Sequence, residues 1–227
     1  MRNKSLMFLA VAALAGFSLL AGCVRRTAPM AKAPAPSDAA VSAVAFLNKT
    51  FAVAPFTIPT SDADLLSGYL PAEHGVPELA LPRLDAVMDE VLSSSTQHFV
   101  PAAMVAACAK TASRGTESGR LATRKYWQNV GMCAGADYIV VPLALHWRER
   151  DGSAMGSTNP ASVDLSIYLL DVRTGGIVRH FHYEETQKAL AENLLDAKKF
   201  IARHGRFLSA AELSQEALTQ CAREFGL

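Results

Sequence analysis

The sequence has no excess of charge of either sign, and it lacks the motifs of several common catalytic sites. It contains 22 Lys and Arg against 21 Asp and Glu, for a formal net charge of +1. This balance argues against a nucleic-acid-binding surface. There is no GxSxG, no HExxH, no paired CxxC, and no Walker lysine in the glycine-containing stretch 114–120. We therefore expect no enzyme, no cofactor and no nucleic-acid partner.

The sequence also lacks an apolar run long enough for a membrane helix. The run from Leu6 to Leu20 has about 15 residues, whereas a span needs about 20. It follows Arg2 and Lys4 and ends in Leu-Leu-Ala-Gly-Cys at 19–23, which resembles a bacterial lipobox. This pattern predicts a signal peptide at 1–22 and lipidation of Cys23. The alternative is an ordinary secretory signal with Cys23 next to the cut by chance.

The lipobox also predicts where the protein resides. Two long acyl chains on Cys23 would contribute on the order of 20 kcal/mol, enough for stable anchoring. Val24 and Arg25 follow the cysteine, so the aspartate that resembles an inner-membrane retention signal is absent. We expect an outer-membrane protein that faces the periplasm and contacts the membrane through its lipid anchor.

The rest of the chain divides into a tether and one domain. Residues 23–48 are rich in Ala, Pro and Ser, as linkers are. Residues 49–227 are enough for a single α/β domain, whose mixed, mostly antiparallel sheet packs against helices in the order β-α-β-α-α-β-β-β-α-α. The predicted strands are 50–58, 98–100, 137–148, 163–172 and 177–184, and the predicted helices include 78–94, 187–203 and 210–225. We expect long loops at 57–77 and 151–160.

The hairpin 163–184 holds the best candidate for chemistry. A turn with a bulge at Gly175 would place Tyr168 opposite His180 and Ser166 opposite His182. One face then carries Asp164, Ser166, Tyr168, His180, His182 and Glu184. His180 and His182 with a carboxylate could bind a metal. We favour the alternative of a solvated or partner-covered polar face, and we predict no metal.

Three cysteines remain if Cys23 is acylated. Cys108 and Cys133 lie near the ends of neighbouring predicted helices and are the candidate disulfide pair, which an oxidising periplasm would permit. Buried free thiols are the alternative, which we slightly prefer, and Cys221 is left over if the pair forms.

Three segments resemble a known family. They are 51–56, 135–141 and 170–178, and they are similar to segments of the curli-secretion lipoprotein superfamily, the amino-terminal domain of TolB and the ring lipoprotein of Pel polysaccharide export. The resemblance covers most of 50–186. The curli channel adds long membrane-spanning hairpins, for which this chain has no spare strands. The resemblance therefore implies a periplasmic scaffold or ring component and not a pore.

Together these observations predict a non-catalytic adaptor, or an oligomeric component, of an outer-membrane assembly or export system. Its partners would be envelope proteins or further copies of the same chain. The alternative is a periplasmic ligand- or glycan-binding lipoprotein that uses loop 57–77 and the polar hairpin face. The scattered positions of His74, His98, His146, His180 and His182 argue against an enzyme.

Overall fold

Strands and helices follow one another in the predicted order, with one small hairpin added. The computed structural model describes residues 46, 48–188 and 197–227, all within one unit of the chain, Pro36–Leu227. The predicted signal peptide, Cys23 and nearly all of the predicted tether lie outside the described residues. The elements are β1 (Thr50–Val53), η1 (Glu78–Ala80), α2 (Leu81–Leu92), β2 (His98–Phe99), α3 (Ala102–Thr111), α4 (Gly119–Cys133), β3 (Tyr138–Arg148), β4 (Asp151–Ser153), β5 (Gly156–Asn159), β6 (Ser162–Asp171), β7 (Ile177–Thr186), α5 (Ala197–Ala202) and α6 (Ala210–Phe225).

A five-stranded sheet in the order β2-β1-β3-β6-β7 forms the centre of the domain. β1 pairs in parallel with β2 and β3, while β3 with β6 and β6 with β7 form long antiparallel ladders. The α/β class and the mixed, mostly antiparallel sheet are thus confirmed. β3 lies in the middle of the sheet, where its run of buried residues predicts it to be.

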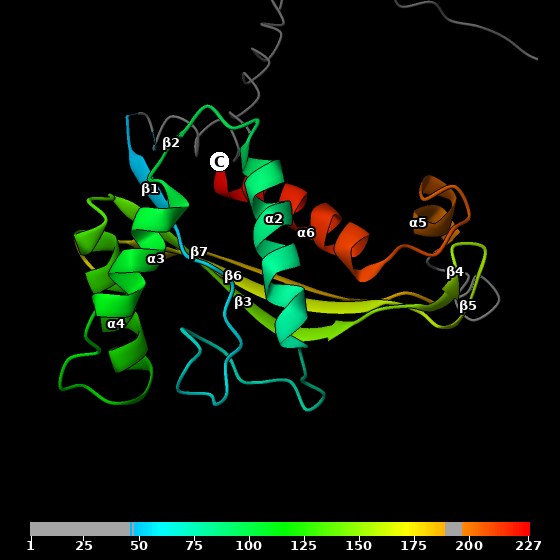
Figure 1. The fold of residues 1–227 in the computed structure, drawn as a ribbon, viewed down its shortest axis with the longest axis horizontal. Helices are drawn as coiled ribbons and strands as arrows, with labels where there is room; N and C mark the ends of the chain where they lie inside the picture. The colour runs from blue at the N-terminus through cyan, green and yellow to red at the C-terminus, as the bar shows by residue number, and fades with distance from the viewer. Residues whose placement is uncertain (1–45, 47, 189–196) are drawn as a thin grey trace, which may run out of the picture. The chain divides into compact units, whose positions relative to one another are not determined.

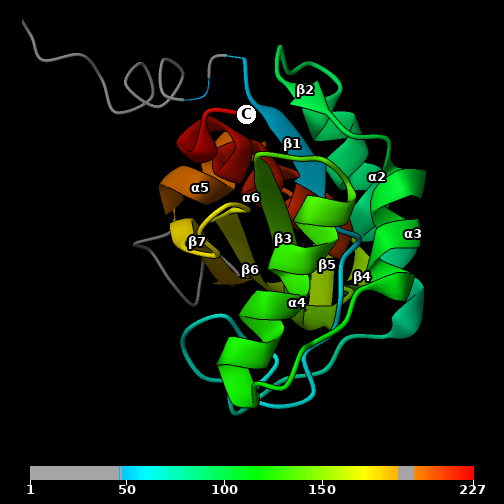
Figure 2. The ribbon, with the colours of Figure 1, turned by 90° about the vertical axis from the view of Figure 1, so that its left-hand side faces the viewer.

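Helices pack on both faces of the sheet. On one face α2 lies beside α6 (Figure 1), and their apolar side chains meet those of β3 and β6, including Leu165 and Leu169. On the other face α3 lies beside α4 (Figure 2), and both pack against Ile139, Val141 and Leu170. One side of β6 enters the first core through Val163, Leu165, Ile167 and Leu169. The other side contributes Tyr168 and Leu170 to the second core and carries the buried polar residues Ser162, Asp164 and Ser166, so the strand is buried along almost its whole length.

Local sequence signals account for the helices on the first face. In α2 the buried residues Leu84, Met88 and Leu92 recur every four positions. α6 begins with the predicted capping box, in which the Ser209 hydroxyl accepts from the Glu212 amide and the Glu212 carboxylate accepts from the Ser209 amide. It ends at Gly226, whose φ of 77° is the left-handed conformation typical of a helix stop.

Two sequence-based boundaries are wrong. β1 ends at Val53 rather than at residue 58, because Pro55 lacks the N–H that a ladder requires, and only an isolated bridge joins Thr57 to Leu143. The stretch 151–160, predicted as a loop, contains the β4–β5 hairpin. The sequence contains no sign of this hairpin because its strands are short and exposed, and their glycine and serine residues are more typical of loops.

Two further boundaries move. The predicted helix 187–203 does not begin at Gln187, whose backbone N–H pairs with Ala161 and whose side chain accepts from the Leu208 amide. Residues 189–196 lie outside the described residues, and α5 covers Ala197–Ala202. Phe46 falls within the predicted tether but is buried against Phe51. None of the helices in the described part of the chain combines the length and apolarity needed to span a membrane.

Candidate functional site

The polar face of the β6–β7 hairpin forms as the sequence predicts. Tyr168 lies opposite His180, Ser166 opposite His182, and Asp164 opposite Glu184. Gly175 takes the left-handed conformation with φ of 70° in the turn. We call these six residues the hairpin face. One detail differs, because a register shift between Leu169 and Leu170 changes the pairing next to the turn.

Loop 57–77 runs beside the hairpin face. It pairs with β3 at both of its ends, through Thr57 and through Gly75, whose carbonyl accepts from the Trp147 amide at 2.9 Å. Between these points the Tyr168 hydroxyl donates to the Ser67 carbonyl at 3.0 Å. The two features that the sequence suggests for a ligand site are therefore neighbours.

His180 has a structural environment. Its Nε2 is 2.8 Å from the Ser166 hydroxyl, and its ring stacks on Tyr168 with centroids 4.3 Å apart. Burial, followed by the charge of His182, lowers the pKa of His180 below its ordinary value. The contacts with Ser166 and Tyr168 therefore give His180 a structural role in the packing of the hairpin face.

A second group on the hairpin face is poorly satisfied. Asp164 is only 4% exposed, and its Oδ1 has no hydrogen-bond partner in the part of the chain that the structure describes. His182 Nδ1 is 3.5 Å from that oxygen, without hydrogen-bond geometry. Burial raises the pKa of Asp164 to about 6, with His182 opposing the rise and Glu184 adding to it. The buried carboxylate is thus left short of compensating contacts.

His146 belongs to the same neighbourhood. It lies directly opposite Asp164 on β3, next to a bulge between Ala144 and His146. Its Nδ1 is buried, and no described residue forms a hydrogen bond with it. Burial and the charge of Arg148 lower the pKa of His146, while Glu73 and Glu184 oppose them. Three of the five histidines that look scattered in the sequence therefore gather on one face, whereas His74 and His98 lie exposed elsewhere.

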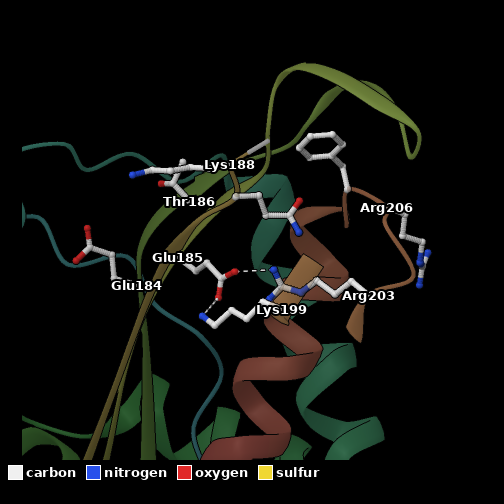
Figure 3. Close-up of a pocket in the computed structure, with 9 residues that line it drawn as sticks. Glu184, Glu185, Thr186, Lys188, Lys199, Arg203 and Arg206 are labelled. Atoms are coloured by element: carbon white, nitrogen blue, oxygen red, sulfur yellow. Dashed lines mark hydrogen bonds and ion pairs between the residues drawn. The ribbon is translucent and has the colours of Figure 1, made fainter. Parts of the chain in front are cut away.

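The opposite side of β7 holds a charged hollow of about 530 Å³ (Figure 3). Glu185 is ion-paired there with Arg203 at 2.6 Å and Lys199 at 3.0 Å. Burial opposes ionisation, but hydrogen bonds from Arg203, Lys199 and Tyr183 hold the pKa of Glu185 down to about 2. Glu184 points away from this ion pair, as alternation along a strand requires. Sequence reasoning missed the hollow because the whole segment from 187 to 203 is predicted to be one helix, which gives no reason to expect residues after 199 to face the end of β7.

The cysteines belong to neither feature. Cys108 in α3 and Cys133 at the end of α4 are joined by a disulfide with Cα atoms 5.7 Å apart. Cys221 is a buried free thiol in α6, and burial raises its pKa far above the ordinary range. Trp127 and Trp147 are both buried in the two cores.

Comparison with known proteins yields structural likenesses only. No family model matches the chain, and no curated protein matches it. The fold is similar to a PelC dodecamer subunit from Paraburkholderia phytofirmans, with 12% identity over 79% of this chain and 87% of that chain and a TM-score of 0.39. It is similar to lipoprotein GNA1162 from Neisseria meningitidis, with 13% identity over 69% of this chain and 93% of that chain and a TM-score of 0.41. It is also similar to the LpoB C-terminal domain from Salmonella enterica, with 13% identity over 66% of this chain and 95% of that chain and a TM-score of 0.35. At these scores the likenesses carry no functional argument, and the proposals below rest on the chain's own residues.

Proposed function

We propose that this protein is a lipid-anchored bacterial envelope protein whose domain binds other envelope proteins and catalyses no reaction. The lipobox that ends at Cys23 and the Ala/Pro-rich stretch that follows it support the anchor. Anchoring at the outer membrane would keep the domain near the assembly and export systems of that membrane. The domain then serves as an adaptor or as a component of an oligomer.

The outer strand β7 is the observation that carries this proposal. It is ten residues long, and no strand in the described part of the chain lies beyond it in the sheet. Alternate residues of an edge strand direct backbone N–H and C=O groups away from the sheet. An extended segment of another protein can therefore add to β7 as a further strand, with backbone hydrogen bonds providing the affinity.

Side chains on β7 would make such a contact selective. Val178 is 38% exposed near the turn end, and the exposed His180, His182 and Glu184 follow along the strand. The strand itself is held rigidly, because Phe181 is buried in the core and Glu185 is ion-paired with Arg203. A rigid edge flanked by polar groups suits selective recognition of one partner segment.

Site-specific photo-crosslinking tests this function. A photoreactive amino acid at Val178 should capture a protein partner when irradiated in intact cells. The same amino acid at Met155, which is 81% exposed in the β4–β5 turn, is the matched control and should capture none. The mass of the product distinguishes a second copy of this chain from a different protein.

The proposal is wrong if Val178 yields no adduct, or if both positions yield the same adducts.

A ligand- or glycan-binding role is the second candidate, because loop 57–77 lies against the hairpin face through Ser67 and Tyr168. That role predicts no protein adduct at Val178.

A further inference from the structure

Three potential metal-binding side chains meet at the far end of the hairpin face from the β6–β7 turn. One ligand atom from each of Asp164, His182 and Glu184 lies within 4.8 Å of the other two. Asp164 comes from β6 and faces Glu184 across the ladder, and His182 lies two residues before Glu184 on the same side of β7. Two paired strands therefore position the group without help from a loop.

Two buried polar atoms at this point have no hydrogen-bond partner among the described residues. One is Asp164 Oδ1, in a residue only 4% exposed. The other is His146 Nδ1, on the neighbouring strand opposite Asp164. Buried charges in proteins are normally paired or coordinate metals, because an uncompensated charge loses its hydration without a replacement. A cation at this point would satisfy the carboxylate.

Distances within the group fit an ion better than a hydrogen bond. Asp164 Oδ1 and His182 Nδ1 are 3.5 Å apart and do not form a hydrogen bond. Two ligand atoms at about 2.0–2.1 Å from one tetrahedral zinc ion lie about 3.3 Å from each other. The third ligand atom, on the exposed Glu184, lies within 4.8 Å of the other two. The side chain of His182 is 47% exposed, which leaves a path for an ion to enter.

From this geometry we infer that Asp164, His182 and Glu184 form a binding site for a divalent transition-metal ion, with zinc the best match. One imidazole and two carboxylates are ligands that zinc accepts, whereas calcium and magnesium favour oxygen ligands alone. The site goes beyond the proposed function, because neither an adaptor nor a strand-pairing edge requires a metal.

The structure also indicates which of the two histidines of β7 would be the metal ligand. His180 and His182 are the pair that the sequence suggests, but the Nε2 of His180 is 2.8 Å from Ser166 and its ring stacks on Tyr168. His182 alone joins the acidic residues in the ligand group. The two histidines therefore provide a matched comparison, two residues apart on one strand.

Calorimetric titration with zinc tests the site. The full-length chain, purified in detergent with a tag that contains no histidine and stripped with a chelator, should bind one zinc ion per chain. His182→Ala and Asp164→Asn should each weaken binding at least about tenfold, because each removes a ligand. His180→Ala and the exposed-site variant His98→Ala should bind as the unaltered chain does. Circular dichroism of each variant checks that it folds.

Protection of His182 provides a second measurement that needs no variant. Zinc should shield His182 from diethyl pyrocarbonate while His98 stays reactive, as read by peptide mass spectrometry. Either result overturns the inference: an unaltered chain that shows no zinc uptake in the micromolar range, or a His182→Ala chain that binds with unchanged affinity. Zinc uptake without protection of His182 would place the ion elsewhere and would also refute the site.

Discussion

Glu185 joins three parts of the fold through a buried ion pair. Its carboxylate meets Arg203 and Lys199, and Arg203 also pairs with Glu216 of α6 at 2.5 Å. These contacts tie the end of β7 to the carboxyl-terminal helices. Removal of one partner from a buried pair leaves the other charge uncompensated, so this network is sensitive to single changes.

Stability should fall in acid as Glu185 takes up a proton. Its pKa is lowered from 4.5 to about 2 in the folded protein, so the stabilisation is complete above pH 4.5 and is lost as the pH falls toward 2. A shift of this size corresponds to about 3 kcal/mol. Urea unfolding at pH 7, 4 and 3 should show a weaker pH dependence for Glu185→Gln than for the unaltered chain.

The exposed Glu224 provides the control for this measurement, and Glu224→Gln should retain the original pH dependence. Equal slopes for Glu185→Gln and the unaltered chain would contradict the prediction. Urea unfolding of both variants measures the free energy of unfolding, so the test does not depend on any activity.

Helix α4 approaches the β6–β7 hairpin closely at Gly131. A Cβ added at this position would lie 2.4 Å from Val172 Cγ2. The nearby side chain of Gln128 donates to the Val172 carbonyl at 3.0 Å, which fixes the helix against the turn. Only glycine allows this separation without displacement of the helix or of Val172.

Gly131→Ala should therefore destabilise the protein, although alanine is the better helix former. We expect a loss of about 1–3 kcal/mol, since overpacking outweighs a helix-propensity gain of about 1 kcal/mol. Thermal unfolding measures the effect. Gly156→Ala is the control, because an added Cβ there meets no atom of the described residues within 4 Å. An unchanged or raised melting temperature for Gly131→Ala would show that the helix moves freely.

Attachment to the membrane should depend on Cys23, which lies outside the described residues. If this cysteine carries the lipid, Cys23→Ser should release the protein into the soluble fraction with its fold unchanged. Membrane fractionation and circular dichroism measure the two properties. Cys221→Ala also removes one cysteine, and it should remain with the membranes. A Cys23→Ser protein that still sediments with membranes would show that the domain itself provides the attachment.

The amino-acid sequence by itself determined the local elements of this protein. Four-residue spacing predicts α2, a capping box predicts α6, and the Gly175 turn predicts the pairing of Tyr168 with His180. These features depend on residues close in the chain, so short-range sterics and hydrogen bonds suffice to specify them. The β4–β5 hairpin escaped prediction because its exposed residues carry no alternating pattern.

Only the tertiary structure decided which polar groups meet and which stay unsatisfied. The pairing of β3 with β6 brings His146 opposite Asp164, and one buried atom of each has no hydrogen-bond partner within residues 46, 48–188 and 197–227. Hydrogen bonding and stacking remove His180 from the group that holds His182. Such outcomes depend on contacts between strands far apart in sequence and on the exclusion of water, which no local pattern of residues encodes.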